Sequence, residues 1–228
     1  MEKQKYAAIV LAAGSGKRMN SQVHKQYLII QDRPVLYYSL KEFEDSAVDE
    51  IVLVVGKGEE EFCRREIVDK YGISKVKAIV EGGKERYHSV FEGLKQTSDA
   101  DYVLIHDGAR PFVNQDIIRR CMQEVQKYQA CVVGMPVKDT IKIADEEGYA
   151  KQTPDRKNVW MIQTPQTFSY ALIYEAYEEM LKTEDTAITD DAMVLERIKG
   201  KKSKLIEGSY RNIKITTPED LLIANVYL

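Results

Sequence analysis

The strongest constraint on the fold is an alternation of short apolar runs with segments of helical periodicity over the first two-thirds of the chain. Apolar residues recur every three or four positions in the helical segments, as Leu36, Leu40 and Phe43 do after Pro34. The runs are typical of strands buried on both faces. They cover residues 6–12, 51–55, 76–80, 102–106 and 130–135. This order predicts an α/β fold with a mostly parallel, twisted sheet, helices on both faces and right-handed crossovers.

The pattern changes between residues 136 and 165. Two short strand-like pieces, residues 140–143 and 159–162, flank a turn-rich stretch and predict a hairpin excursion that is too polar to pack well alone. Helical patterning then resumes. The remaining predictions are helices around 172–181 and 190–198, a solvated basic loop at 199–204, a strand at 212–216, and a last helix opened by Thr217-Pro218-Glu219-Asp220. We find no repeat or linker, and we expect one domain over residues 1–228.

Composition limits the classes of partner and compartment. Among 228 residues, 33 Lys and Arg against 36 Asp and Glu give a net charge of −3, which argues against bulk attraction for nucleic acid or membranes. Cys63, Cys121 and Cys131 form no C-x-x-C pair, so zinc and redox sites are disfavoured and a reducing cytoplasm is indicated. The N-terminal apolar run is too short to span a membrane, and no signal-peptide cleavage pattern follows it. We therefore expect a cytoplasmic protein whose anionic ligands are held by a local cluster of bases.

Glycines and bases follow the first predicted strand, where ligands bind in open α/β sheets. Residues 14–19 read Gly-Ser-Gly-Lys-Arg-Met, and Lys25 comes shortly after. Met19 occupies the place of the third glycine of the dinucleotide fingerprint, and Arg18 occupies the Ser or Thr position of the Walker motif. Dehydrogenases and P-loop kinases are thus disfavoured. Taken alone the segment is more typical of a flexible turn with solvated bases. As a ligand site it would be a phosphate loop with extra cations.

Two further strand ends carry ligand-like residues. Gly82 and Gly83, with Ser89 in the next helix, would let a planar base approach the backbone, although a plain turn explains the glycines equally well. Asp107 follows the fourth strand and suits Mg²⁺, and Arg110 suits a second anion. Together with the first loop, these segments predict a site for a nucleoside triphosphate, Mg²⁺ and a second phosphorylated substrate.

Other candidates are weaker when taken singly. Lys214 alternates with Ile213 and Ile215, so it faces away from the core, where a solvent-facing lysine is the simpler interpretation. His106 is more typical of a packed strand residue than of a metal ligand, since no second histidine lies at ligand spacing. No Cys–His or Ser–His–Asp set stands out, which argues against covalent catalysis.

These motifs taken together resemble those of the 2-C-methyl-D-erythritol 4-phosphate cytidylyltransferase family, within the sugar- and polyol-phosphate nucleotidyltransferases. The resemblance runs in order from about Tyr6 to the C-terminus. It rests on residues 14–19, 25–27, 82–83 with Arg86 and Ser89, 106–111, 136–140, 155–156, 163–166, 189–191 and 212–220. Ribitol-5-phosphate cytidylyltransferases share the first loop, 163–166 and 212–214, whereas 136–142 and 155–156 favour the methylerythritol enzymes. His24 and Gly108 depart from the usual proline and alanine.

The resemblance implies a single Rossmann-like nucleotidyltransferase domain that transfers CMP from CTP to 2-C-methyl-D-erythritol 4-phosphate in the non-mevalonate isoprenoid pathway. It implies a homodimer in which residues 136–165 form a protruding β-arm, with Thr140 and Arg156 reaching the partner's site. The roles it implies are catalysis by Arg18, Lys25 and Lys214; nucleotide binding by Ala12, Ala13, Gly14, Ser15, Gly16, Gly82, Gly83 and Ser89; substrate binding by Asp107, Arg110, Thr140, Arg156, Thr189 and Lys214; and Mg²⁺ binding by Asp107.

Three alternatives remain open. A ribitol-5-phosphate enzyme would run the same chemistry on another polyol. A glycosyltransferase of similar fold would need an Asp-x-Asp motif after the fourth strand, where this chain has His106-Asp107-Gly108. A non-catalytic nucleotide-binding protein would not need both Arg18 and Lys25 at the reacting phosphate.

Overall fold

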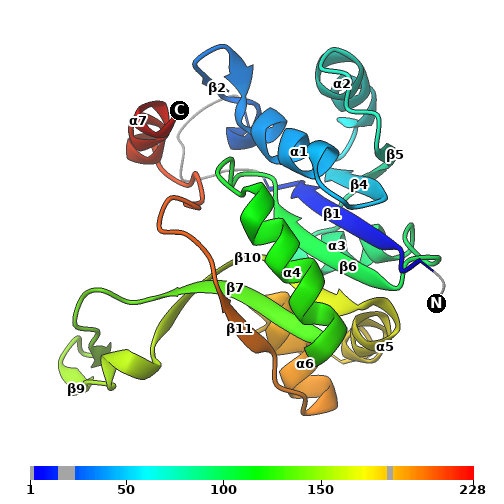
Figure 1. Cartoon of the computed structure of the whole chain (residues 1–228). Helices are drawn as coiled ribbons and strands as arrows, with labels where there is room; N and C mark the ends of the chain where they lie inside the picture. Colours follow the sequence, from blue (N-terminus) through cyan, green and yellow to red (C-terminus); the bar gives the residue numbers. More distant parts are fainter. Residues whose placement is uncertain (1–2, 15–23, 184–186) are drawn as a thin grey trace.

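A seven-stranded sheet forms the centre of the computed structural model, which describes residues 3–14, 24–183 and 187–228 (Figure 1). Across the sheet the strands are β11 (Lys204–Glu207), β7 (Ala130–Pro136), β10 (Trp160–Ser169), β6 (Tyr102–Asp107), β1 (Tyr6–Ala12), β4 (Glu50–Val55) and β5 (Val76–Glu81). All neighbouring strands are parallel except β10, which is antiparallel to β6 and to β7. The prediction of a mostly parallel sheet is confirmed.

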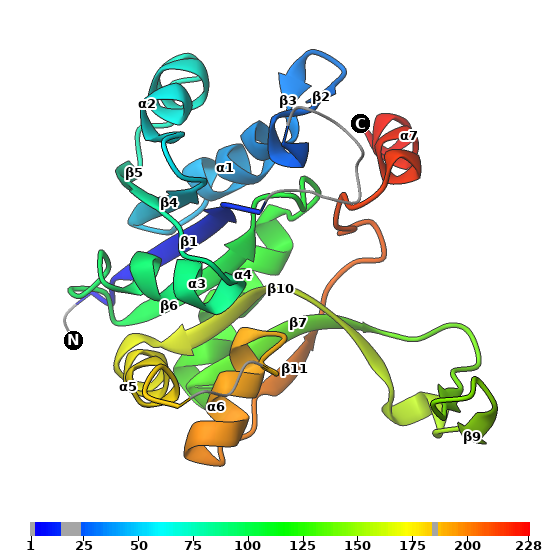
Figure 2. The same ribbon diagram turned by 180° about the vertical axis from the view of Figure 1, so that it is seen from behind.

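Helices cover both faces of this sheet (Figures 1 and 2). On one face lie α1 (Val35–Asp45), α2 (Glu60–Cys63), which continues into a π-helical turn (Arg64–Asp69), and α4 (Gln115–Tyr128). On the other lie α3 (Arg86–Leu94), α5 (Tyr170–Met180) and α6 (Asp191–Lys199). None of the helices in the described ranges is both long and apolar enough to cross a membrane.

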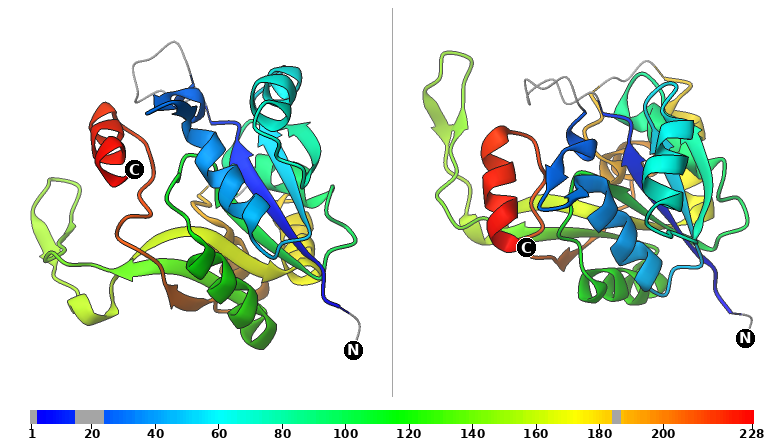
Figure 3. Two further views of the ribbon diagram at one scale, coloured as in Figure 1. Left: turned by 45° about the horizontal axis from the view of Figure 1, so that its top comes forward. Right: turned by 90° about the horizontal axis from the view of Figure 1, so that it is seen from above.

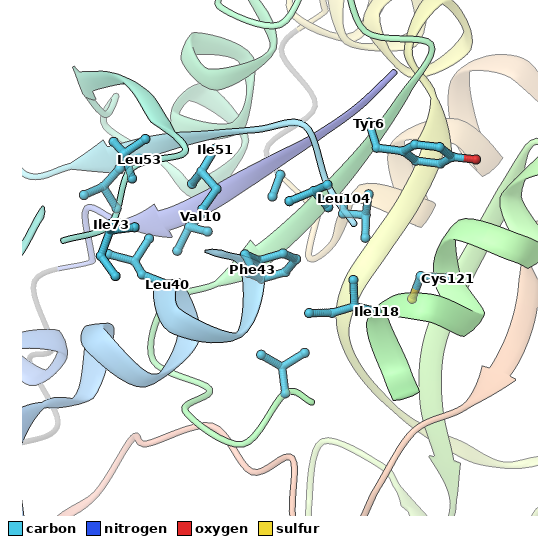
Figure 4. Packing of buried hydrophobic residues seen from close by; sticks show 14 of the residues in the cluster. Tyr6, Val10, Leu40, Phe43, Ile51, Leu53, Ile73, Leu104, Ile118 and Cys121 are labelled. Atoms are coloured by element: carbon cyan, nitrogen blue, oxygen red, sulfur yellow. The ribbon is translucent and has the colours of Figure 1, made fainter. Parts of the chain in front are cut away.

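Alternate residues of β1 supply the two cores, as the period of a strand requires. Val10 packs beneath α1 with Phe43 and Leu104, in the cluster drawn in Figure 4. Ile9 points to the opposite face and joins Phe168 of β10 in the second cluster. The central strands are therefore buried on both sides, which accounts for their continuous apolar runs.

The structure corrects the prediction for residues 159–162, which do not pair within a hairpin. Residues 160–162 begin β10, a ten-residue strand inserted between β6 and β7 in the central sheet, and Val159 precedes it. The pairing register with β7 shifts between Ile162 and Gln166, around the cis Thr164–Pro165 bond. A proline is tolerated in a central strand only at such an irregularity, because it has no amide hydrogen for the ladder. Pro165 also interrupts the sequence pattern by which a strand would be predicted here.

Residues 137–159 leave the sheet as an arm, which projects clear of the sheet and its helices (Figure 3). The Val137 amide donates to the Val159 carbonyl at 3.0 Å and closes the base of this arm. Its tip is a small hairpin of β8 (Ile143–Ala144) and β9 (Ala150–Gln152). The predicted excursion is thus present, but the predicted strand at 140–143 is wrong except for Ile143, and residues 160–165 belong to the central sheet.

The C-terminal part differs from the sequence prediction in two places. The basic run predicted as a loop ends at Lys204, where edge strand β11 begins and pairs with β7. The strand predicted at 212–216 is wrong: this stretch is extended but has no ladder, and the Ile215 amide instead donates to the Ala109 carbonyl at 2.8 Å. Helix α7 (Pro218–Tyr227) begins after the N-cap residue Thr217, as predicted, and Thr217 forms a capping box with Asp220.

Helix α1 follows directly after Pro34, which is its N-cap residue. A two-stranded ribbon, β2 (Ile29–Ile30) with β3 (Arg33–Pro34), precedes that helix. Ile30 of this ribbon packs with Ile215 and Ala224 of the C-terminal segment in a small third cluster. The C-terminal segment is therefore held beside the carboxyl edge of the sheet, where Lys214 lies.

We expect Gly93→Ala to destabilise the fold, although alanine is the better helix former by about 1 kcal/mol. A Cβ on Gly93 would lie 2.5 Å from Cγ2 of Ile9 and 3.2 Å from Cγ2 of Val54, both on buried β-branched side chains that have no room to move. Overpacking of this kind costs about 1–3 kcal/mol. Urea unfolding would measure it, with Glu92→Ala on the outer side of α3 as a control that changes stability by less than about 0.5 kcal/mol. An unchanged or raised midpoint for Gly93→Ala would contradict the packing described.

Candidate active site at the carboxyl edge of the sheet

The first cavity, of about 300 Å³, lies beyond the carboxyl ends of β1, β5 and β6. Residues of three predicted segments meet there. Its lining is Leu11, Ala12, Ala13, Gly14, Lys25, Gln26, Gly83, Lys84, Glu85, Arg86, Ser89, Asp107, Ala109 and Lys214. Residues far apart in sequence converge because parallel strands all end at one edge. Of the predicted phosphate loop, Ser15, Gly16 and Arg18 lie outside the described residues.

Lys25 lines this cavity from a short 3₁₀ turn (Lys25–Tyr27) whose neighbouring residues are anchored. The Gln26 side chain is buried and donates to the Ala12 carbonyl at 2.5 Å. The Tyr27 hydroxyl donates to Glu59 at 2.7 Å, and His24 lies 2.7 Å from the other oxygen of the same carboxylate. These contacts fix the backbone on both sides of Lys25 relative to the end of β1.

The glycine pair after β5 is packed tightly against the start of α3. The Gly83 amide donates to the Ser89 hydroxyl at 3.1 Å, and both residues line the first cavity. Gly82 lies just behind: a Cβ there would come within 2.6 Å of Ala13 Cβ and 2.7 Å of Ser89 Oγ. Absence of a side chain at Gly82 therefore lets the β1 and β5 segments approach each other.

A second cavity, of about 330 Å³, adjoins the first. It is lined by Arg86, Asp107, Arg110, Ile162, Gln163, Thr164, Gln166, Thr189, Asp190 and Lys214. Arg86, Asp107 and Lys214 line both cavities, so these side chains form the wall between them. Two ligands, one in each cavity, would meet at this wall.

The carboxylate of Asp107 is surrounded by cations. Lys214 Nζ lies 2.8 Å from one of its oxygens, Arg86 Nε lies 3.3 Å from the other, and Arg110 Nε lies 3.9 Å away. Burial alone would raise the pKa of Asp107, but Arg86, Lys214 and Arg110 together hold it well below its ordinary value. The carboxylate is therefore ionised at any physiological pH.

Hydrogen bonds from behind fix the backbone at Asp107. The Asp107 amide donates to the Thr164 hydroxyl at 3.1 Å, and that hydroxyl lies 3.0 Å from Nδ1 of His106. His106 Nε2 lies 3.2 Å from the Arg110 carbonyl. A neutral imidazole with its proton on Nε2 satisfies all three contacts. Burial lowers the pKa of His106 to about 3, in keeping with the neutral form. His106 is a packed residue, as predicted.

Arg110 is suited to hold an anion in the second cavity. Its Nη1 donates to the Asn212 carbonyl at 2.7 Å, which fixes the guanidinium. Among the described residues, no hydrogen-bond acceptor is found for its buried Nε. A buried donor without an acceptor is costly, and a phosphate oxygen would supply one.

A magnesium ion held at the predicted ligand Asp107 would need further ligands from a bound polyphosphate and from water. Within the described ranges no group of three or more His, Cys, Asp or Glu side chains could hold a metal by itself. Asp107 is the carboxylate that lines both cavities. Mg²⁺ is commonly bound by one or two carboxylates plus substrate phosphates and water, so Asp107 is the residue that would hold it.

The predicted residues are thus divided between three places. Thr189 lines the second cavity. Thr140 and Arg156 lie on the arm, are exposed, and are absent from the lining of both cavities. Lys214 reaches the wall from an extended segment instead of the predicted strand.

The sequence predicted no role for Arg86 of the wall, nor for Gln26 and Thr164, which line one cavity each. Arg86 belongs to one of the motifs of the resemblance and comes three positions after Gly83, at the start of α3, where a cation close to a strand end could have marked it. Gln26 and Thr164 carry no such signal, because their importance lies in contacts with Ala12 and with Asp107.

Comparison with known proteins agrees with this geometry. The model of the 2-C-methyl-D-erythritol 4-phosphate cytidylyltransferase family matches residues 6–228. The enzyme of that name from Lachnospira eligens is 54% identical over 223 residues, covering 97% of this chain and 98% of the relative. The one from Lachnoclostridium phytofermentans is 50% identical over 225 residues, covering 99% and 97%.

A solved structure gives the same result. The 4-diphosphocytidyl-2C-methyl-D-erythritol synthase of Anaerococcus prevotii superposes with a TM-score of 0.86 at 38% identity, covering 98% of this chain and 96% of that one. Near-complete coverage on both sides means that the sheet, both cavities and the arm all fall within the similarity. The chain belongs to the 2-C-methyl-D-erythritol 4-phosphate cytidylyltransferase family.

Proposed function

We propose that this protein transfers CMP from CTP to 2-C-methyl-D-erythritol 4-phosphate, releasing pyrophosphate and forming 4-diphosphocytidyl-2-C-methyl-D-erythritol for isoprenoid synthesis. The observation that carries the proposal is the pair of adjacent cavities that share Arg86, Asp107 and Lys214. A group transfer needs two substrates whose reacting atoms meet, and a shared wall supplies that meeting point. The names of the relatives supply the identity of both substrates.

CTP is assigned to the first cavity. Backbone groups of 12–14, which line this cavity, would hold the triphosphate together with Ser15 and Gly16. Gly83 and Ser89, which also line it, would accept the cytosine together with Gly82. Asp107 would hold Mg²⁺ on the phosphates, where the ion neutralises charge when bound. Arg18 and Lys25 would lie at the α-phosphate, where charge develops.

The acceptor phosphate is assigned to the second cavity, held by Arg110 and Lys214, with Thr189 on the polyol. One of its oxygens attacks the α-phosphorus of CTP in line. A new P–O bond forms, the bond from the α-phosphorus to the bridging oxygen breaks, and pyrophosphate leaves with that electron pair. Fixed cations lower this barrier most when they face the oxygens on which charge grows.

The arm supports a homodimer in which each site is shared. Tyr149 is 71% exposed and Ile143 is 46% exposed, in a hairpin that has little packing of its own. A second copy of the chain would bury these side chains. Thr140 and Arg156 of this arm would then lie at the acceptor cavity of that second copy. The cytoplasm is the proposed compartment, since Cys63, Cys121 and Cys131 are free thiols.

Pyrophosphate release tests the proposed function directly. With CTP and Mg²⁺, we expect rapid release in the presence of 2-C-methyl-D-erythritol 4-phosphate and only background release with ribitol 5-phosphate or without an acceptor. EDTA should stop the reaction, and excess Mg²⁺ should restore it. Faster turnover of ribitol 5-phosphate would mean that ribitol 5-phosphate is the acceptor substrate. No pyrophosphate release with either acceptor would refute the transferase assignment.

Lys25→Ala should lower kcat by about 100-fold or more, because it removes a cation fixed at the reacting phosphate. Lys127→Ala is the matched control: Lys127 is exposed near the end of α4, where it pairs with Glu124 at 2.7 Å, and its loss should leave kcat unchanged. Circular dichroism would show that both variants keep the fold. Turnover of Lys25→Ala close to that of the parent would remove Lys25 from the catalytic assignment.

Mixed dimers test the sharing of sites between chains. One chain carries Arg156→Ala, the other carries Lys25→Ala, and two different tags allow isolation of the mixed species. One site then combines an intact Lys25 with an intact partner arm, so about half of the parent activity should return. Each variant homodimer serves as the control and should be nearly inactive. A mixed dimer as inactive as its parents would mean that each arm serves its own chain.

A further inference from the structure

Behind the wall between the two cavities, the fully buried Asp191 forms an ion pair with Arg86, which is partly exposed. Arg86 is the first residue of α3, and Asp191 is the first residue of α6, 105 positions later in the chain. Two parallel hydrogen bonds join them, at 2.7 Å from Nη1 and 2.9 Å from Nη2. The Asp191 side chain is 0% exposed. Such a bidentate contact fixes the plane of the guanidinium as well as its position.

The carboxylate of Asp191 is itself held in place. The Tyr177 hydroxyl of α5 donates to the Asp191 oxygen that also receives Arg86 Nη1, at 2.6 Å. Gln166 of β10 accepts from the Ala192 amide at 2.9 Å and donates to Asp190 at 3.0 Å. The start of α6 is thereby fixed to the central sheet, and Asp191 has a single orientation toward Arg86.

On its other side Arg86 faces the site. Its Nε donates to Asp107 at 3.3 Å, and its side chain lines both cavities. Asp191, in contrast, lines neither cavity. Burial would lower the pKa of Arg86, but Asp191 and Asp107 raise it well above its ordinary value, so the guanidinium stays charged. The chain of contacts runs from Asp191 through Arg86 to Asp107.

We propose that Asp191 is a positioning residue: it holds the Arg86 guanidinium in the wall between the nucleotide and acceptor cavities, and through Arg86 it fixes Asp107 for both substrates. The inference rests on the proposed function, because it assigns one substrate to each cavity. An ion pair with one fully buried partner adds little net stability, since the cost of removing charge from water offsets the attraction. Its effect here is orientation, and misplacement of a substrate-positioning group by about 1 Å costs on the order of 100-fold in rate.

Asp191→Asn keeps the size of the side chain and removes its charge. We expect KM to rise for CTP and for the acceptor, and kcat to fall, so that kcat/KM drops about 10- to 100-fold for both. Two control variants change a residue that lines one cavity only. Ser89 lines the first cavity, so Ser89→Ala should raise KM mainly for CTP; Thr189 lines the second, so Thr189→Ala should raise KM mainly for the acceptor. A loss confined to one substrate, or unchanged kinetics in folded Asp191→Asn, would overturn the proposal.

A second background separates positioning from general support of the fold. In Arg86→Met the guanidinium is absent, so Asp191→Asn should change kcat/KM by less than about two-fold, whereas it costs at least about 10-fold beside the native Arg86. Equal losses in both backgrounds would mean that Asp191 supports the fold without acting through Arg86, and the proposal would fail. The wild-type protein is assayed first, so failure of the proposed function appears as absent turnover before any variant is compared.

Tyr177→Phe keeps the test decisive if Asp191→Asn does not fold. It removes one hydrogen bond to the Asp191 carboxylate and leaves the ion pair in place. We expect kcat/KM to fall about two- to five-fold for both substrates with Arg86 present and to stay unchanged in Arg86→Met. Parent-like values for both substrates in folded Tyr177→Phe would overturn the proposal.

Discussion

The ionised carboxylate of Asp107, at the carboxyl end of β6, is the interaction on which the site depends. Lys214 arrives from the C-terminal segment, Arg86 from α3 and Arg110 from the loop after β6, and all three converge on this one side chain. Three cations this close would repel one another in a poorly hydrated cleft without the carboxylate. Asp107 therefore holds together three segments that the sheet alone brings only into the same neighbourhood, and it keeps their charges aimed at the boundary between the two cavities.

The parts of this arrangement that were predicted from sequence share one physical property: they directly follow buried parallel strands. Such strands appear as continuous apolar runs, so the sequence alone places Gly83 and Asp107 at the sheet edge. The contact of Arg86 with Asp191 could not, because it joins the first turns of two helices, and neither the helical pattern nor the N-terminal signals of α6 indicate which cation lies opposite. The local sequence pattern predicts helices and strands. Which side chains pair across 105 residues, as Arg86 and Asp191 do, is decided by the three-dimensional fold.

Two wrong predictions have the same origin. The strand expected at 212–216 has period-two alternation, yet its position is set by the bond from the Ile215 amide to the Ala109 carbonyl, not by a ladder. Conversely, β10 contains Pro165 and lacks a clean period, yet it lies in the middle of the sheet, where its irregular part brings the Thr164 hydroxyl to the Asp107 amide. Period-two patterning reports which residues are buried, while ladder membership depends on neighbours that the pattern does not identify.

A chain of net charge −3 can hold a polyphosphate because its site cations are fixed at one place. Asp191 is paired with Arg86 from behind, so the guanidinium reaches the cavities in one orientation, already linked to Asp107. Arg110 and Lys214 also lie beside Asp107. A single carboxylate cannot neutralise these two cations as well as Arg86. A bound phosphate would supply the missing anion and the missing acceptor for Arg110 Nε together. Affinity for small polyanions thus comes from where the cations are fixed, and net charge, which governs long-range attraction, is free to be negative.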